Sequence, residues 1–211
     1  TTLLYLLAGI LQPDEGQLYI DNRSLSHLQP GRELSKLVGI IHQQYDLVPH
    51  LPVIHNVLAG RLGQWSLFRS LISLVWPQER QVALSELAKL GIADKAQERT
   101  SHLSGGEQQR VAIARVMVQS PSVVLADEPV ASLDPARAEE ILRLLTELTT
   151  SAGKTLIASL HSPYLIHKYC SRVIGLRQGQ IVFDLPASDV TEAVLDCLYN
   201  LNEYPDEELV P

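Results

Sequence analysis

Cysteine is scarce in this 211-residue sequence, which contains only Cys170 and Cys197. The two cysteines are isolated and lack metal-ligand spacing, so neither a zinc site nor a disulfide framework is indicated. Long apolar runs are lacking as well, and none approaches the roughly 20 residues that a membrane-spanning helix needs. These two absences predict reduced thiols in a cytosolic protein with no helix that crosses a bilayer.

Basic residues are too few and too scattered to form a surface for nucleic acid. Seventeen lysines and arginines stand against 24 acidic residues, which gives a net charge of −7, and they form no basic stripe. Binding to a nucleic-acid backbone depends on such a stripe, so we expect no nucleic-acid partner. With 45% hydrophobic residues, the chain can bury one substantial core and can form a single domain with an inserted subdomain.

The most specific motif is Leu-Ser-Gly-Gly-Glu-Gln-Gln-Arg, at residues 103–110. Ser104 stands three residues before Glu107, which is the spacing of a capping box at the start of a helix. Gly105 and Gly106 leave the N–H groups of the first turn uncovered, so an anion can approach the positive end of the helix dipole. Capping boxes also open many helices that bind nothing, and both interpretations remain open at this point.

An apolar run at residues 123–126 ends in two carboxylates, Asp127 and Glu128. The run predicts a buried parallel strand, and open parallel sheets bind their ligands beyond the carboxyl ends of the strands. Magnesium prefers carboxylate oxygens together with phosphate oxygens. The alternative is a solvated pair of acids at a strand end, which would carry no function.

Three further polar residues stand at the ends of apolar runs or at the start of a helix. Asp134 precedes a proline and an amphipathic stretch, which predicts a helix N-cap. His161 follows the apolar run 155–160, and Gln43 follows the apolar run 37–41. Taken singly, the histidine is as well explained as a surface residue, and a lone glutamine is weak support for any function.

In this order, the motifs resemble those of the nucleotide-binding subunit of ABC transporters, and the resemblance covers the whole chain. It implies an α/β fold of the P-loop NTPase class, with a RecA-like parallel sheet as its core. It also implies an ABC-specific α-helical subdomain at about residues 46–103, inserted in one ATP-binding domain that spans residues 1–211.

The resemblance assigns one group of residues to an ATP molecule and its Mg²⁺ ion. Asp127 is then the residue that holds Mg²⁺, and Glu128 orients or deprotonates the attacking water. Gln43 helps to ligate the metal and the water, and His161 contacts the γ-phosphate. The implied activity is ATP hydrolysis, with ATP and Mg²⁺ as cofactors.

A second group is implied to serve the ATP of a neighbouring subunit. Ser104, Gly105 and Gly106 contact the γ-phosphate of an ATP that the partner mainly holds, and Asp134 lies in a loop that communicates across the dimer. The resemblance therefore implies a head-to-tail homodimer that encloses two ATP molecules. The N-cap interpretation of Asp134 is compatible with this role.

No stretch of the sequence fits Gly-x-x-x-x-Gly-Lys-Ser/Thr, the loop that holds phosphates in P-loop NTPases. The chain opens instead on Thr1 and Thr2 and continues as an apolar stretch to Gly9, like the helix that follows such a loop. Thr1 then matches the threonine that ligates Mg²⁺, and both threonines are expected near ATP. We expect a fragment that begins within this motif, lacks the P-loop strand, binds ATP poorly and hydrolyses it negligibly.

Within the family, the chain looks closest to the ATPase subunits of phosphonate importers, on residues 56–63, 126–135 and 173–184. Relatives commonly have glycine where Leu185 stands, so the local turn is open. The similarity implies uptake of phosphonate or a related phosphorus oxyanion, with a membrane permease and a periplasmic or lipid-anchored substrate-binding protein as partners. It implies a peripheral location on the cytoplasmic face of the bacterial inner membrane.

Other interpretations of the same motifs remain open. The chain could be an ABC ATPase for another cargo, an ABC protein of DNA repair or translation, or a binding module without turnover. Tandem cassettes, coiled-coil inserts and basic arms, which are usual in the non-transport group, are not visible. Asp127, Glu128 and His161 argue against a degenerate module, whereas the missing lysine favours it.

Hydrophobic periodicity predicts the remaining elements. The stretch 65–76 is expected to be a helix or loop packed on protein, or else a surface near the permease or the lipid headgroups. An acidic end at residues 203–211 is expected to fray. The other expected elements are a strand pair around 17–20, a helix at 78–90, strands at 172–176 and 180–183 joined by a tight turn, and a helix at 187–199 capped by Ser188 or Asp189.

Overall fold

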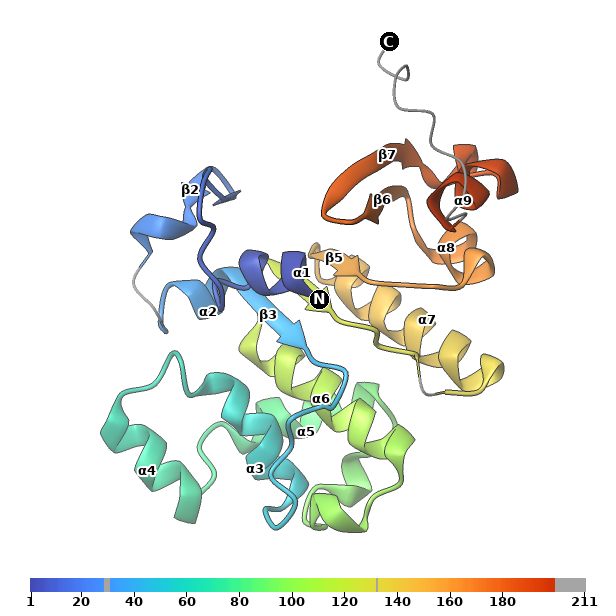
Figure 1. Ribbon diagram of the computed structural model, residues 1–211. Coiled ribbons are helices and arrows are strands. Elements are labelled where there is room, and N and C mark those ends of the chain that lie inside the picture. The colour runs from blue at the N-terminus through green and yellow to red at the C-terminus, as the bar shows by residue number, and fades with distance from the viewer. Residues whose placement is uncertain (29–30, 132, 200–211) are drawn as a thin grey trace. The chain divides into compact units, whose positions relative to one another are not determined.

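The computed structural model describes residues 1–28, 31–131 and 133–199 of the chain (Figure 1). The described residues form two compact units, one up to Leu160 and the other from His161 onward. The acidic end at 203–211 lies outside the described residues.

A parallel sheet forms the centre of the first unit. Its strands are β3 (Val38–Ile41), β4 (Val123–Ala126) and β5 (Thr155–Ala158), in the order β3-β4-β5. The central strand β4 is a short apolar run because helices cover both faces of the sheet. The parallel strand predicted at 123–126 is confirmed, and the strand predicted at 37–41 begins one residue later because Leu37 closes α2 (Leu34–Leu37).

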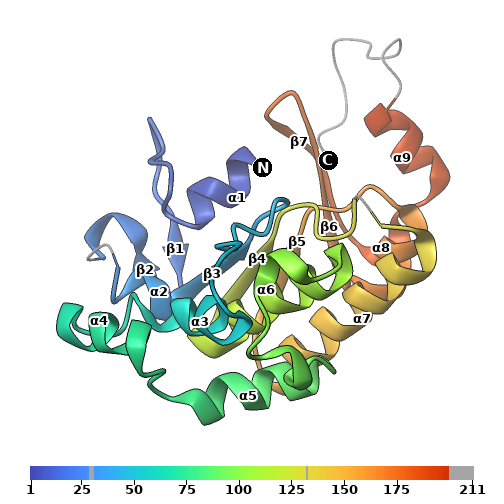
Figure 2. The same cartoon turned by 90° about the horizontal axis from the view of Figure 1, so that it is seen from below.

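Alternate residues of β4 pack into two different cores, as the two-residue period of a strand requires. Leu125 faces α1 (Thr2–Leu7) and packs with Leu4 and Val38. Val124 and Ala126 face the opposite way, into the larger core built around α6 (Gly105–Gln119). Figure 2 shows α6 alongside the sheet, and α7 (Pro135–Ser151) connects β4 to β5.

A small hairpin lies between α1 and α2 in the sequence. Strands β1 (Tyr19–Ile20) and β2 (Arg23–Ser24) pair antiparallel, as expected for a strand pair in this region. The two residues between them, Asp21 and Asn22, have φ values of 50° and 58°. A two-residue turn with both φ values positive matches the right-handed twist of the paired strands, and Asp and Asn tolerate it well.

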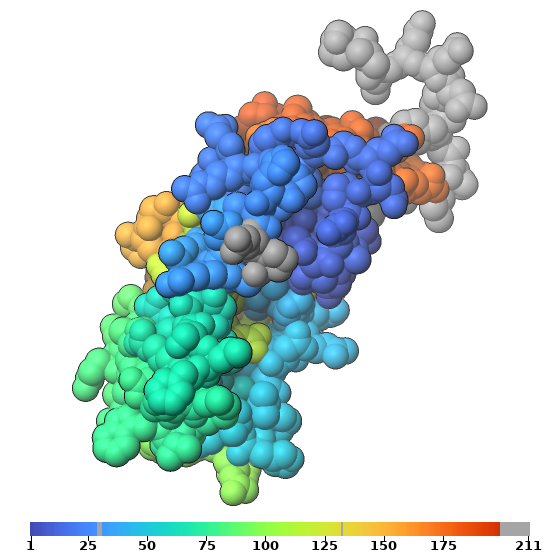
Figure 3. All heavy atoms as spheres, turned by 90° about the vertical axis from the view of Figure 1, so that its left-hand side faces the viewer, coloured from blue at the N-terminus to red at the C-terminus, as the bar shows by residue number. Residues whose placement is uncertain are grey.

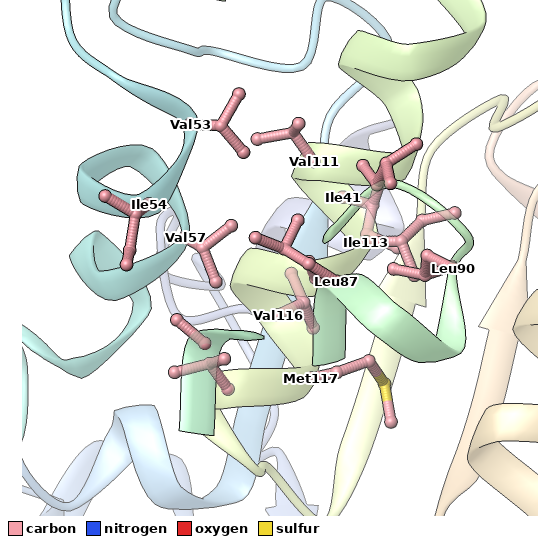
Figure 4. Packing of buried hydrophobic residues seen from close by; sticks show 14 of the residues in the cluster. Ile41, Val53, Ile54, Val57, Leu87, Leu90, Val111, Ile113, Val116 and Met117 are labelled. Atoms are coloured by element: carbon pink, nitrogen blue, oxygen red, sulfur yellow. The ribbon is translucent and has the colours of Figure 1, made fainter. Parts of the chain in front are cut away.

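Between residues 46 and 103 the elements are helical. They are α3 (Val53–Leu58), η2 (Ala59–Arg61), α4 (Leu67–Val75), α5 (Arg80–Lys89), η3 (Ala93–Lys95) and η4 (Thr100–His102). Figure 4 shows α3 and α5 packed against α6 through fully buried side chains such as Val57, Leu87 and Val111. The assignment of this region as an inserted subdomain stays a prediction.

Helix α5 starts later than expected. The predicted helix was 78–90, but Glu79 has a left-handed backbone with φ 55°, and the helix begins at Arg80. A left-handed residue cannot belong to a right-handed helix, and this conformation is set by tertiary contacts that periodicity does not register. The Glu79 carboxylate lies 2.6 Å from the Arg69 guanidinium and 3.2 Å from that of Arg61.

Helix α4 turns its apolar side outward. It forms where the sequence predicted a helix or loop at 65–76, and Ser66 caps it by accepting a hydrogen bond from the Arg69 N–H at 3.3 Å. Phe68 is 75% exposed and Trp76 is 74% exposed, so the expected packing of this stretch on protein does not occur for these side chains. Figure 3 shows this side of the molecule, with residues of this region in blue-green.

The second unit is built on an antiparallel hairpin of β6 (Arg172–Arg177) and β7 (Gln180–Pro186). Gln178 and Gly179 form the turn with φ values of 49° and 81°, so the predicted tight turn is confirmed. Leu185 pairs with Val173 and extends β7, which shows that its replacement of glycine introduces no turn. Helix α8 (Pro163–Tyr169) begins with Ser162 as its N-cap.

The C-terminal helix was predicted with the wrong start. Residues 187–189 form the short 3-10 helix η5 (Ala187–Asp189), Val190 is extended, and α9 (Glu192–Tyr199) begins after it. The Ser188 hydroxyl donates to the Asp189 carboxylate at 2.9 Å, so neither side chain caps the helix. The Val194 N–H instead donates to the Thr191 hydroxyl at 3.3 Å, which makes Thr191 the capping side chain.

Across the described ranges, no helix combines the length and the apolar character needed to cross a membrane.

We predict that Gly60→Ala destabilises the protein by about 1–3 kcal/mol, because overpacking forces backbone to move. A Cβ atom at Gly60 would lie 2.1 Å from the carbonyl oxygen of Arg115 in α6. Gly106→Ala is the matched control, since a Cβ there meets nothing within 4 Å. Urea unfolding of both variants tests this, and an equal free energy of unfolding for Gly60→Ala and the unsubstituted protein would contradict it.

Candidate active site

Three neighbouring strands end at the same edge of the sheet and bring polar residues together there. Ile41, Ala126 and Ala158 are register partners at the carboxyl ends of β3, β4 and β5. The next residues on β4 and β5 are Asp127 and Ser159, and the ladder continues through them. The Asp127 N–H donates to the Ile41 carbonyl at 2.9 Å, and the Ser159 N–H donates to the Ala126 carbonyl at 3.0 Å.

Asp127 is buried and accepts hydrogen bonds from two hydroxyl groups. Its Oδ1 atom lies 3.2 Å from the Thr1 hydroxyl and 3.1 Å from the Ser159 hydroxyl. Only 4% of the residue is exposed. A buried carboxylate is stable only when it is hydrogen-bonded, and these donors meet that requirement. Two residues predicted to serve Mg²⁺, Thr1 and Asp127, are therefore in contact.

Glu128 has an unusual backbone that two neighbouring residues hold in place. Its φ value is 47°, in the left-handed region that residues with a side chain seldom adopt. The Glu128 N–H donates to the Ser159 hydroxyl at 2.7 Å, and its carbonyl accepts from Ala131 at 3.3 Å. Such a conformation persists when surrounding contacts determine it, and it occurs often at functional sites.

Gln43 meets Glu128 across the edge of the sheet. The Gln43 Nε2 atom donates to the Glu128 Oε2 atom at 3.0 Å. The glutamine follows β3 by two residues, whereas the glutamate follows β4, so the contact depends on the parallel pairing of these strands. The structure thus brings Thr1, Gln43, Asp127 and Glu128 into one hydrogen-bonded group, and Thr2 lies beside it as the first residue of α1.

Ser159 is the member of this group that sequence reasoning missed. Its single hydroxyl donates to Asp127 and accepts from the Glu128 backbone, so it links both acids. The run 155–160 has the pattern of one apolar segment, and Ser159 lies inside it. A polar residue directly after the three apolar residues Leu156–Ala158 is the available signal, since strand ends carry the ligand-binding groups of parallel sheets.

Ser104 opens α6 as the sequence predicted. Its hydroxyl accepts a hydrogen bond from the Glu107 N–H at 3.4 Å, and its own N–H donates to the Glu107 carboxylate at 2.8 Å. This reciprocal pair is a capping box. The hydroxyl of Ser104 also donates to the Glu107 carboxylate at 2.7 Å. These hydrogen bonds from Ser104, that of the hydroxyl first, hold the pKa of Glu107 below its usual value.

The glycines beside Ser104 leave space at the start of α6. A Cβ atom at Gly105 or Gly106 would meet no atom within 4 Å. Further along α6, the Gln109 side chain reaches Pro129, the residue after Glu128. Since a helix rises about 1.5 Å per residue, Ser104 lies about 7.5 Å further along the axis than Gln109. The two glycines therefore stand at the start of α6, ahead of the residue that contacts the turn after β4.

Asp134 caps α7, as predicted. Its Oδ1 atom accepts from the Arg137 N–H at 3.1 Å, and its Oδ2 atom lies 3.3 Å from the Arg137 guanidinium. A role across a dimer stays a prediction. His161 opens the second unit, and its contact with a γ-phosphate likewise stays a prediction.

Comparison with known proteins identifies the family. The model of the ABC transporter family matches residues 1–131. The phosphonates import ATP-binding protein PhnC of Pseudomonas putida is 43% identical over 213 residues, which cover 100% of this chain and 77% of that protein. PhnC 3 of Halalkalibacterium halodurans is 41% identical, over 94% of this chain and 78% of that protein. The chain belongs to the ABC transporter family.

Solved structures agree with this assignment. The dimeric structure of MJ0796, a bacterial ABC transporter cassette, has a TM-score of 0.73 at 29% identity and covers 88% of this chain and 79% of that one. CbiO1 of Clostridium perfringens, part of the ABC transporter complex cbiONQ, has a TM-score of 0.75 at 29% identity. The match covers 95% of this chain and 78% of CbiO1. The predicted α/β fold of the P-loop NTPase class is confirmed, and the chain is an ABC-type ATPase domain.

We predict that Ser159→Ala lowers the free energy of unfolding by about 1–3 kcal/mol, because it removes a hydrogen-bond partner from the buried Asp127 carboxylate and from the part-buried Glu128 N–H. Ser159→Thr keeps the hydroxyl and should retain most of the stability. Ser151→Ala is the control, since this exposed hydroxyl contacts only the Leu148 carbonyl of its own helix, at 3.3 Å. If the two alanine variants had equal free energies of unfolding in urea, the hydrogen bonds of the Ser159 hydroxyl would contribute nothing to stability.

Stability should also depend on the ionisation of Glu107. Because the folded protein depresses the pKa of this group, its contribution is present above the ordinary glutamate pKa and is lost as the pH falls through the folded value. We expect Glu107→Gln to be less stable than the unsubstituted protein near neutral pH, with the difference shrinking as the pH falls from about 5 to 3. Urea unfolding across this range measures it, and a pH-independent difference would contradict the linkage.

Proposed function

We propose that the chain is the ATP-hydrolysing subunit of an importer for phosphonate or a related phosphorus oxyanion. The observation that carries the hydrolytic part is the hydrogen-bonded group of Thr1, Gln43, Asp127 and Glu128 at the carboxyl edge of the sheet. The cargo rests on the relatives, which are named phosphonates import proteins. An ATPase subunit does not contact the transported cargo. The cargo assignment is therefore supported by similarity to these relatives and not by residues of the site.

The oxygen atoms at the edge of the sheet suit Mg²⁺. The Thr1 hydroxyl and the Asp127 carboxylate, whose oxygens are 3.2 Å apart, would hold the ion, and Gln43 is close enough to Glu128 to assist. No cluster of three or more His, Cys, Asp or Glu residues suited to a metal occurs among the residues that the structure describes. Magnesium needs few protein ligands when nucleotide phosphates supply others. When bound, the ion neutralises charge on the phosphates.

Glu128 is the residue that we assign to the attacking water. Its carboxylate can accept the proton of that water, and Gln43 Nε2, at 3.0 Å, holds one of its oxygens in position. Its left-handed backbone and the Ser159 hydroxyl set the direction in which the side chain leaves β4. Phosphoryl transfer depends mainly on positioning and charge, so fixed side chains of this kind are what the reaction requires.

The open start of α6 supports a dimer. A Cβ atom at Gly105 or Gly106 would meet no atom within 4 Å, so the start of α6 leaves room for an anion at the positive end of the helix. In the proposed homodimer these residues face the ATP of the other subunit, and Asp134 lies in a loop at the interface. The proposed role of His161 is to contact the γ-phosphate.

The complete importer would contain further partners. We propose that the ATPase dimer binds membrane permease subunits, which receive cargo from a periplasmic or lipid-anchored substrate-binding protein. The subunit would then work as a peripheral protein at the cytoplasmic face of the bacterial inner membrane. The names of the relatives, which are import proteins, support this arrangement.

ATP hydrolysis tests the proposal. The 211 residues contain no stretch of the pattern Gly-x-x-x-x-Gly-Lys-Ser/Thr, so the assay uses a chimera in which these residues replace the aligned 77% of the Pseudomonas putida relative. We expect Mg²⁺-dependent turnover that falls by about 100-fold or more in Glu128→Gln, the size of a lost general base. ATP should then trap this variant as a dimer in size-exclusion chromatography.

The control is Glu147→Gln, which removes a carboxylate that is 57% exposed and pairs with Arg143 on α7. This variant should keep the turnover of the unsubstituted chimera. Absence of both turnover and an ATP-dependent dimer in the unsubstituted chimera would reject the proposal and would favour a module that binds without hydrolysis.

A further inference from the structure

Two polar side chains of α6 reach the two loops that carry Gln43 and Glu128. Arg115 donates from Nη2 to the Tyr45 carbonyl at 2.7 Å and from Nη1 to the Asp46 carbonyl at 2.7 Å. Gln109 donates from Nε2 to the Pro129 carbonyl. One rigid helix therefore contacts the loop after β3 and the turn after β4, six residues apart along its own axis.

The loop held by Arg115 has a conformation that needs external support. Tyr45 and Asp46 are consecutive residues with φ values of 60° and 46°, in the left-handed region that disfavours residues with side chains. A guanidinium presents its donors in a fixed fork, so it holds two adjacent carbonyls in one geometry. Partial burial of the guanidinium lowers the pKa of Arg115 from its ordinary value, and the nearby Asp46 carboxylate opposes this shift.

Gln109 is placed where an apolar side chain would be expected. The residue is fully buried, and its Oε1 atom has no hydrogen-bond partner among the residues that the structure describes. A buried unpaired acceptor lowers stability, and packing alone would be served by leucine at this position. The contact with Pro129 is what distinguishes glutamine from leucine here.

We infer that Arg115 and Gln109 are positioning residues that make α6 a bracket for the loops of Gln43 and Glu128. The helix that forms this bracket starts at Gly105 and Gly106, with Ser104 as its N-cap. Its effect on catalysis rests on the proposed function, in which these three residues face the nucleotide of the other subunit. A nucleotide bound at the start of α6 would then act on Gln43 and Glu128 of the same chain, which links the two sites of a dimer through one helix.

Hydrogen exchange of the full chain without nucleotide tests the bracket directly. In Arg115→Gln, the amides of Tyr45 and Asp46, which donate to His42 and Gln44, should exchange about tenfold faster or more, as expected for loss of charge-assisted hydrogen bonds. Arg110→Gln is the matched control, because Arg110 also lies on α6 but donates to the Leu90 carbonyl and to Glu140. Unchanged exchange in Arg115→Gln, or an equal rise in Arg110→Gln, would overturn the inference.

Gln109→Leu tests the second arm of the bracket. The Ala131 amide, which donates to the Glu128 carbonyl, should exchange faster while the urea midpoint of the protein stays the same or rises. A merely structural glutamine would give the opposite pattern, with a lower midpoint and unchanged local exchange. That pattern would remove Gln109 from the inference.

Turnover of the chimera supplies an independent readout. We expect Arg115→Gln to lower kcat by about tenfold while KM for ATP changes less than about twofold, since positioning acts on the transition state. Arg115→Lys, which retains one donor towards the carbonyls, should recover part of kcat. A lower kcat with normal exchange would overturn the bracket, whereas a chimera without any turnover would reject the proposed function and leave the exchange results to decide the bracket.

Discussion

The burial of β4 on both faces is the constraint on which the rest of this structure depends. Leu125 packs into the core around α1, whereas Val124 and Ala126 pack into the core around α6. A strand buried on both sides has no polar residue along its length, so its chemistry is confined to its end. Asp127 and Glu128 follow there, and the register with the neighbouring strands determines which residues meet them.

Two adjacent acids at a strand end would repel each other and would need separate partners, and the backbone provides this separation. Asp127 keeps the direction of the strand and accepts from hydroxyl groups, whereas Glu128 turns into the left-handed region and meets Gln43. The Ser159 hydroxyl stabilises both arrangements, since it donates to one residue and accepts from the other. The strained turn is therefore supported by the same strand that forms one edge of the sheet.

Local patterns predicted the parts of the site that depend on local chemistry. The caps at Ser104 and Asp134 follow from short-range hydrogen bonds, and the strand before Asp127 follows from an apolar run. Ser159 and Arg115 act through partners 31 and 70 residues away, so a local sequence pattern of about ten to twenty residues cannot contain both members of either pair. The start of α9 was missed for another reason, because several adjacent residues can cap a helix and tertiary packing selects among them.

Helix α6 unites these observations because it belongs to the core and to the site at once. Its apolar side is fully buried against α3 and α5, through residues such as Val111 and Ile113 (Figure 4). A close-packed helix of this kind moves as a rigid body, since shifting one turn would open a cavity elsewhere. Any displacement at its start is then shared by Gln109 and Arg115. The packing that stabilises the fold thus also couples the start of α6 to the two loops that Gln109 and Arg115 contact.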